Sequence, residues 1–71
     1  MKLSARNQLK GRILEVKKGA TTSHVRIDIG GGAIGAIVTA SITNEAVADL
    51  DLKAGDEAWA IIKATDVMIG K

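Results

Sequence analysis

The sequence contains no cysteine, one histidine and one aromatic residue, and each scarcity excludes a class of function. Without cysteine there is no disulfide framework, no thiolate nucleophile and no zinc site with cysteine ligands. The single histidine, His24, cannot form a histidine-rich metal site within one chain. The single aromatic, Trp59, is too little for a surface on which the bases of a nucleic acid strand stack. We therefore predict no metal site and no nucleic-acid partner.

The chain also lacks long apolar and long basic runs. Its first residues have no apolar segment of the kind found in secretion signals, and no apolar run approaches the length that spans a bilayer. Ten basic and eight acidic residues are spread along the chain, so its net charge of +2 forms no nucleic-acid-binding arm. These patterns predict a cytoplasmic protein with no membrane partner.

A chain of 71 residues has room for one domain, which we expect to span residues 1–71. So small a core covers only part of its own apolar surface, and such domains often need disulfides, metals or partner subunits. Because the first two are disfavoured by composition, partner subunits remain. The hydrophobic fraction of 46%, nearly all aliphatic, agrees with apolar side chains at interfaces between copies.

Alternation of apolar and polar residues predicts a mostly β fold. It is cleanest in Ser23–Ile29, where Val25, Ile27 and Ile29 share one face. A glycine inside the third predicted strand, Gly35, indicates a bulge or a close backbone approach. The predicted strands are Gln8–Lys18, Ser23–Ile29, Ala33–Ile42, Glu57–Lys63 and Val67–Gly70.

Turns and one helix separate these strands. Thr43 is a typical N-cap, and the residues after it to Leu50 predict a short helix. Turns are expected at Lys18–Thr22, with Gly19 free to adopt a positive φ, and around Gly55. Gly30–Gly32 is a hairpin connection or an anion-binding loop, and the hairpin is favoured because a strand, not a helix, follows.

The element order is therefore β-β-β-α-β-β. This predicts an all-β protein with one short helix, built as a five-stranded OB-like barrel. An SH3-like barrel can produce a similar order.

A catalytic function is disfavoured. Ser4 or Ser23 with His24 and Asp28 could be written as a nucleophilic triad. However, His24 and Asp28 lie on the solvent face of one predicted strand, where two polar side chains are expected without any catalytic role. We predict no catalytic residue.

A small-anion site fits the polar residues better. Ser4 and Arg6 supply hydrogen-bond donors, and no acidic side chain precedes Glu15. Near the other end of the chain Lys63 stands beside small residues and a hydroxyl, and Thr43 marks a helix start. Each residue alone has an ordinary structural explanation, so only their combination favours an oxyanion.

Three segments carry a resemblance to a known family. Met1–Gly11 (MKLSARNQLKG), Ile42–Leu50 (with Ile-Thr, Ala-Val and Leu at matching spacing) and Ile62–Gly70 (IKATDVMIG) follow one another in the family's order. The chain thereby resembles the molbindin (Mop) family of molybdate- and tungstate-binding proteins along nearly its whole length. The resemblance implies an OB-like barrel of the TOBE or Mop type, assembled as a homo-hexamer (a trimer of dimers) with oxyanions at subunit interfaces.

The resemblance also implies the site residues. The main oxyanion site would use Ser4, Ala5 and Arg6, completed by Thr43, Lys63 and Ala64 of a neighbouring subunit. A second oxyanion site near the symmetry axes would use Lys18, Gly19, Ala20, Thr21 and His24, although His24 could equally be an ordinary surface residue. Some relatives carry serine where this chain has Ala46, so one hydroxyl contact is in doubt here.

The function expected from these residues is intracellular storage or buffering of molybdate or tungstate without catalysis. The ligand is the bound oxyanion itself, and no catalytic cofactor is expected. A pterin ligand is left open, though one aromatic residue offers little for stacking. The alternative is an OB-fold module that binds single-stranded nucleic acid.

Overall fold

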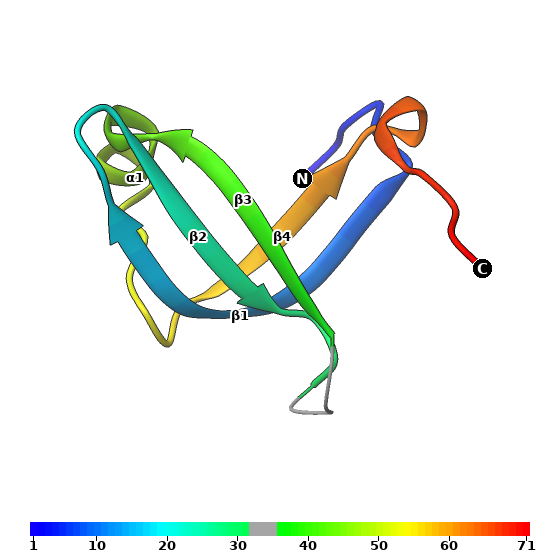
Figure 1. Cartoon of the computed structure of the whole chain (residues 1–71), viewed down its shortest axis with the longest axis horizontal. Coiled ribbons are helices and arrows are strands. Elements are labelled where there is room, and N and C mark those ends of the chain that lie inside the picture. The colour runs from blue at the N-terminus through cyan, green and yellow to red at the C-terminus, as the bar shows by residue number, and fades with distance from the viewer. Residues whose placement is uncertain (32–35) are drawn as a thin grey trace.

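The computed structural model describes residues 1–31 and 36–71 of the chain. Within them, four strands form one antiparallel sheet in the order β3-β2-β1-β4 (Figure 1). A helix connects the third and fourth strands, and a short 3₁₀ turn follows the fourth. The elements are β1 (Asn7–Lys18), β2 (Thr22–Asp28), β3 (Ile37–Thr43), α1 (Asn44–Leu50), β4 (Glu57–Ile62) and η1 (Ala64–Asp66).

The sheet curls because its longest strand has different partners along its two halves. The first half of β1, from Asn7 to Arg12, pairs with β4. Its second half, from Arg12 to Lys18, pairs with β2. The register shifts between Ile13 and Glu15, and such a bulge increases the local bend and twist of a strand. The result is a half-barrel that stays open between its two edge strands, β3 and β4 (Figure 1).

The core lies on the concave side of this half-barrel. Its buried apolar residues come from three strands and are Ile13, Val25, Ile27 and Ala60. The period-2 alternation of β2 is exact in the structure, since Ser23, Val25 and Ile27 are buried and the residues between them are exposed.

Gly11 lies where β1 passes closest to the end of β2. A Cβ atom at this position would lie 2.4 Å from the carbonyl oxygen of Asp28 and 2.7 Å from a methyl group of Ile27. No other residue type fits this crossing without a backbone shift, so a single glycine permits the bend of the sheet.

The helix is capped as the sequence predicts. The Thr43 hydroxyl oxygen accepts a hydrogen bond from the backbone N–H of Ala46 at 3.0 Å, and Asp51 ends the helix in a left-handed conformation. Gly55 has a φ of +94°, which confirms the turn expected there. Gly19 does not have a positive φ. Its turn needs glycine because a Cβ would lie 2.8 Å from the carbonyl oxygen of Thr22.

The predicted strands agree with β1, β2 and β4 to within one or two residues. The third begins at Ile37, and the expectations for Gly32, Ala33 and the bulge at Gly35 fall outside the described residues.

The predicted fifth strand at Val67–Gly70, and the barrel that it would close, are not confirmed, because the described residues form a sheet of four strands. After β4, the backbone N–H of Asp66 bonds to the carbonyl oxygen of Lys63 at 2.9 Å, and this 3₁₀ turn directs the chain away from β4. The residues that follow have no strand partner within the described part of the chain, and Met68 and Ile69 are 92% and 91% exposed.

Candidate functional site

The N-terminal segment Ser4–Arg6 lies beside Lys63 and Ala64. The cause is the β1–β4 ladder, in which Asn7 pairs with Ile62, so that the residues just before and just after this pair are neighbours. Figure 1 shows the N-terminal segment and the η1 turn at the same corner of the molecule. The structure therefore joins two of the three segments that carry the predicted site.

Two side-chain amides hold this corner together. The Asn7 side chain donates to the backbone carbonyl oxygen of Ile62 at 3.1 Å, and the Gln8 side chain donates to that of Ala5 at 3.2 Å. Sequence reasoning named no role for either amide. Their position directly after Arg6 was the available signal, because an amide can donate to a neighbouring carbonyl and fix a loop.

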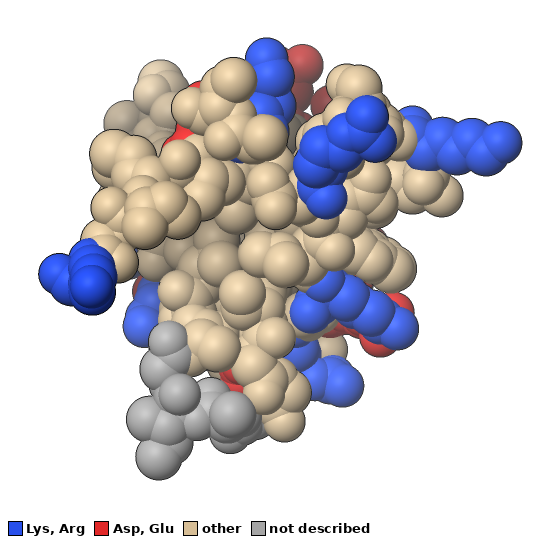
Figure 2. Space-filling view, turned by 90° about the vertical axis from the view of Figure 1, so that its right-hand side faces the viewer, with Lys and Arg blue, Asp and Glu red and all other residues tan. Residues whose placement is uncertain are grey.

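The corner carries cations that no carboxylate neutralises by direct contact. In the stretches 1–31 and 36–71, ion pairs join Lys10 with Glu57 and Lys53 with Asp51, and neither pair involves Arg6 or Lys63. Both residues are exposed. Figure 2 looks onto this side of the molecule and shows Lys and Arg side chains spread over it, with few acidic side chains between them. An anion would find two available positive charges here.

The chemistry of the corner suits an oxyanion without a proton. Arginine and lysine side chains only donate hydrogen bonds, and the Ser4 hydroxyl can donate one as well. Charge-assisted hydrogen bonds from such groups are stronger than those between neutral partners. The η1 turn at this corner also contains one acidic residue, Asp66.

Thr43 is not part of this corner in a single chain. It ends β3 immediately before α1, and Figure 1 shows α1 on the opposite side of the half-barrel from η1. Sequence reasoning grouped Thr43 with Lys63 and Ala64 on a neighbouring subunit. The structure instead groups Lys63 and Ala64 with Ser4–Arg6 of the same chain.

The residues of the second predicted site form the β1–β2 turn, which lies against the start of α1. The backbone N–H of Asn44 donates to the carbonyl oxygen of Thr21 at 2.9 Å, and its side chain donates to that of Gly19 at 3.0 Å. Thr43 pairs with Thr22 across β3 and β2. The structure therefore places Thr43 near the second predicted site, together with Lys18–Thr21.

His24 lies in β2, two residues after the start of the strand. It is exposed on β2, opposite Lys17 of β1 and Ser41 of β3. Lys18 instead pairs with Ser23, whose side chain is buried on the other face. Because neighbouring residues of a strand point to opposite faces, the His24 side chain lies on the outer face of β2.

A buried polar contact connects β2 to α1 and was missed by sequence reasoning. Ser23 is 1% exposed, and its hydroxyl donates to the side-chain oxygen of Asn44 at 2.5 Å. Asn44 thus fixes the turn, the strand and the helix start relative to one another. The available sequence signal for this contact was an asparagine, Asn44, directly after the predicted N-cap Thr43.

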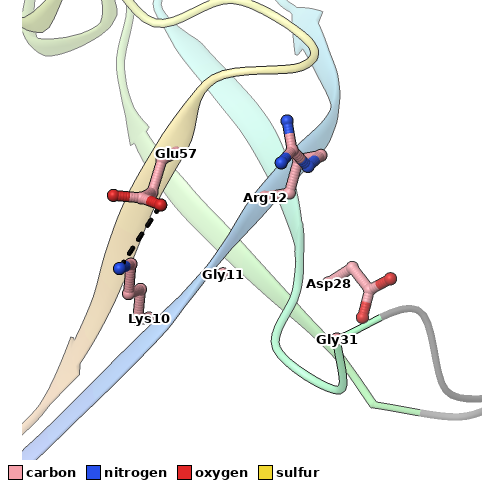
Figure 3. A pocket seen from close by; sticks show the side chains of 6 residues that line it. All are labelled: Lys10, Gly11, Arg12, Asp28, Gly31 and Glu57. Atoms are coloured by element: carbon pink, nitrogen blue, oxygen red, sulfur yellow. Dashed lines mark ion pairs between the residues drawn. The ribbon is translucent and has the colours of Figure 1, made fainter.

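A hollow of about 410 Å³ lies on another side of the molecule, lined by Lys10, Gly11, Arg12, Asp28, Gly31 and Glu57 (Figure 3). Its charged groups already have partners. Lys10 pairs with Glu57 at 3.4 Å, the Arg12 guanidinium donates to the carbonyl oxygen of Gly55 at 2.8 Å, and the Asp28 carboxylate accepts from the backbone N–H of Gly30 at 2.9 Å. Two carboxylates among the lining residues disfavour an anion.

The described residues offer no catalytic or metal-binding cluster. Asp28 uses its carboxylate within its own loop, and His24 faces solvent on β2, so the triad considered from the sequence is not assembled. No group of three or more His, Asp or Glu side chains in residues 1–31 and 36–71 could hold a metal ion. In the same part of the chain, no helix has the length and apolar character needed to cross a membrane.

Comparison with known proteins identifies the family. The TOBE domain matches residues 3–69. A probable molybdenum-pterin-binding protein of Haemophilus influenzae is 49% identical over 70 residues, which cover 99% of this chain and 97% of the relative. The chain belongs to the molbindin (Mop) family of TOBE-domain proteins.

Solved structures of Mop-family proteins share the fold of this chain. A molybdate-binding protein from Sporomusa ovata is 38% identical, with a TM-score of 0.88 and full coverage of both chains. ModG, a cytoplasmic molybdate-binding protein solved with molybdate bound, is 42% identical with a TM-score of 0.81. The match covers 90% of this chain and 43% of ModG.

Proposed function

We propose that this Mop-family protein binds molybdate, and also tungstate, as intact oxyanions and performs no chemical step on them. The observation that carries the proposal is the corner formed by Ser4–Arg6 and Lys63–Ala64, where two exposed cations lack a carboxylate partner among the described residues. The Haemophilus and Sporomusa relatives, whose names state molybdenum-pterin or molybdate binding, support the same ligand class.

The ligand and the corner are chemically matched. Molybdate at neutral pH is a tetrahedral dianion that only accepts hydrogen bonds, so a site made of donors favours it over anions that carry a proton. Sulfate has the same charge and shape but is smaller. Selectivity therefore depends on the size of the cavity that encloses the anion.

We further propose that the enclosure is completed between copies of the chain. Thr43 lies too far around the half-barrel to reach Arg6 in the same chain, so it would enter the site from a neighbouring copy (Figure 1). An arrangement as a homo-hexamer, a trimer of dimers, fits this requirement and the small core of one chain. Anion binding would then stabilise the assembly, because the ligand binds the assembled state better than separate chains.

The biological role that follows is an intracellular store or buffer of molybdate in the cytoplasm. A binding protein without turnover holds the anion in proportion to its concentration and releases it as that concentration falls. The second site, at Lys18–Thr21, would add capacity at another interface. The turn's contact with Asn44 and the neighbouring Thr43 is what supports this second position.

Isothermal titration of the purified protein with molybdate, tungstate and sulfate tests the proposal. We expect saturable binding of the first two, much weaker binding of sulfate, and at least tenfold weaker molybdate binding in Arg6→Ala and Lys63→Ala. Lys53→Ala is the matched control. It also removes an exposed lysine, but Lys53 lies in the turn before β4 and pairs with Asp51. Equal affinities in all three variants would contradict the site.

Two further measurements on the same purified protein distinguish molybdate from the other candidate ligands. Native mass spectrometry would show molybdate as discrete mass increments on an oligomer. A pterin would appear as a larger increment, and binding of a single-stranded oligonucleotide tighter than that of molybdate would favour the nucleic-acid alternative instead.

A further inference from the structure

Asn44, the first residue of α1, is joined by three hydrogen bonds to a part of the chain more than twenty residues earlier. Its backbone N–H donates to the carbonyl oxygen of Thr21 at 2.9 Å, and its side-chain amide donates to that of Gly19 at 3.0 Å. Its side-chain oxygen accepts from the hydroxyl of Ser23 at 2.5 Å. Figure 1 shows the β1–β2 turn and α1 at the same end of the half-barrel. One residue therefore holds the turn against the start of the helix.

The orientation of the Asn44 amide follows from its two neighbours. A carbonyl oxygen only accepts hydrogen bonds, so the NH₂ group of the amide must face Gly19. The amide oxygen is then left to the Ser23 hydroxyl, which is 1% exposed and shielded from water. Because a buried hydroxyl without a partner is costly, this second contact keeps the NH₂ group directed at the turn.

The bond to Gly19 also decides where the next backbone N–H of the turn points. The described residues contain no cis peptide bond, and the C=O and N–H of a trans peptide point in opposite directions. Since the Gly19 carbonyl faces Asn44, the N–H of Ala20 in the same peptide unit points away from α1. Outward N–H groups of a turn suit an anion, and the exposed Lys18 adds a positive charge just before them. Asn44 thereby shapes the second candidate site without contacting the anion.

Thr43, which the proposed function assigns to the first site of a neighbouring copy, directly precedes Asn44 in the chain. Its hydroxyl oxygen accepts from the backbone N–H of Ala46 at 3.0 Å, which leaves the hydroxyl hydrogen to donate to an anion. Its backbone pairs with Thr22 in the β2–β3 ladder. The turn of the second site and the hydroxyl that completes the first site are thus connected through Asn44 and one ladder pair.

We propose that Asn44 is a positioning residue shared by the two candidate anion sites, and that it makes them cooperative. An anion held by the Lys18–Thr21 turn raises the affinity of the site that Thr43 of the same chain completes on a neighbouring copy. This inference rests on the proposed function, since both sites belong to it. Asn44 itself contacts no anion.

The coupling follows from the peptide unit that Gly19 and Ala20 share. An anion that accepts from the Ala20 N–H polarises this unit and strengthens the bond from Asn44 to Gly19, because linked hydrogen bonds reinforce one another. Thr43 is then restrained before the other anion arrives, so less conformational entropy is lost in the second binding event. Linkage makes the effect equal in both directions.

Two backgrounds isolate the Asn44 side chain without leaving a buried group unpaired. Ser23→Ala keeps the bond from Asn44 to Gly19, whereas Ser23→Ala/Asn44→Ala removes that bond together with the hydroxyl that would otherwise lose its partner. Lys18→Ala is then added to each background to weaken the second site. Titration calorimetry measures molybdate affinity at the first site, which is the site lost in Arg6→Ala.

In the Ser23→Ala background, Lys18→Ala should weaken the first site at least threefold, although Lys18 is not part of that site. In the double background the same substitution should have a much smaller effect, because only the backbone bond from Asn44 to Thr21 remains. A purely electrostatic effect of removing Lys18 would be equal in the two backgrounds. Equal effects, or no effect in either background, would overturn the coupling.

Asn44→Asp provides the same test if the double variant does not fold. Aspartate keeps an acceptor for the Ser23 hydroxyl and suits the first turn of α1, where a negative charge is favourable, but it cannot donate to Gly19. Ala48→Asp is the matched control, since it adds the same charge at an exposed position of α1. We expect the effect of Lys18→Ala on the first site to disappear in Asn44→Asp and to persist in Ala48→Asp. Its loss in both variants would assign the coupling to charge and contradict the role of Asn44.

The backbone amide signal of Ala20 in two-dimensional NMR spectra gives a readout that lower stability does not mimic. In anion-free protein, Asn44→Asp should shift this signal, because the peptide unit loses its hydrogen bond at Gly19, and Ala48→Asp should leave it in place. An unmoved Ala20 signal in Asn44→Asp would show that other contacts hold the turn and would contradict the positioning role.

Failure of this inference and failure of the proposed function give different results. Molybdate binding that depends on Arg6 and Lys63 but is insensitive to Lys18 would keep the proposed function and remove the coupling. A protein that binds no molybdate would remove the proposed function and the cooperativity together, even if the Ala20 signal confirms that Asn44 holds the turn.

Discussion

The side chain of Asn7 donates a hydrogen bond to the backbone carbonyl oxygen of Ile62, at 3.1 Å, and so joins the first residue of β1 to the last residue of β4. This contact reinforces the end of the β1–β4 ladder, which brings together the two segments that carry Arg6 and Lys63. Both cations lie on exposed segments just outside the ladder, each directly beside one member of this pair.

Replacing Asn7 by alanine should therefore weaken anion binding without removing any anion contact. We expect a loss of stability of about 1 kcal/mol, typical of a single hydrogen bond, and a several-fold fall in molybdate affinity. Gln8→Ala is the comparison variant, because it removes an exposed hydrogen bond between residues only three positions apart, Gln8 and Ala5. Titration calorimetry and urea unfolding give both quantities. A wild-type affinity in Asn7→Ala would show that the corner is held by other contacts.

Thr43 has two candidate roles that one substitution can separate. Aspartate is as good an N-cap as threonine, so Thr43→Asp should keep α1 and change the free energy of unfolding by less than about 0.5 kcal/mol. The same change replaces a hydroxyl donor by a negative charge, and molybdate affinity should fall more than tenfold. Thr43→Ser should retain both functions. If Thr43→Asp binds molybdate normally, Thr43 is a helix cap and nothing more.

Gly11→Ala should destabilise the fold by about 1–3 kcal/mol, because the added methyl group would overlap the carbonyl oxygen of Asp28. Gly70→Ala is the matched control, since a Cβ at that position meets nothing within 4 Å. Urea denaturation of both variants measures the difference. Equal stability would mean that β1 and β2 separate at this crossing at little cost.

Asn44→Ala should destabilise the protein by about 1–3 kcal/mol, because it leaves the buried Ser23 hydroxyl without its partner. Ser23→Ala should be less harmful, since it removes the hydroxyl itself. The double variant should lose less stability than the sum of the two single variants, and that shortfall is the coupling energy of the pair. Additive effects in this cycle would contradict a direct interaction.

The sequence was sufficient where the fold depends on local patterns. Alternation located β1, β2 and β4, and Thr43 located the helix start, because each depends on neighbouring residues only. The strand predicted at Val67–Gly70 is not formed. An apolar segment forms a strand only when an edge is available to it, and after the turn at Ala64–Asp66 this one pairs with no strand of the described residues.

For the candidate site, too, the sequence indicated the residue types but not their arrangement in space. The residue types of Ser4, Arg6 and Lys63 indicated an oxyanion, and the family resemblance named them together. Their arrangement could not be read from spacing, because the pairing of Asn7 with Ile62 joins opposite ends of the chain. The solvent-facing position of His24, by contrast, was predicted from its alternation with Val25, and the structure confirms it.

Strand β1 begins at the first candidate anion site and ends at the second, and its length has an electrostatic consequence. Twelve residues at about 3.3 Å each separate the two ends by tens of ångströms, even with the bend at Leu14. The Debye length at physiological ionic strength is about 8 Å, so two dianions at the ends of one strand are screened from each other. Repulsion between them costs little, and both can be held by the same chain. Any cooperativity between the two sites would then come from the protein that joins them and not from the charges of the bound anions.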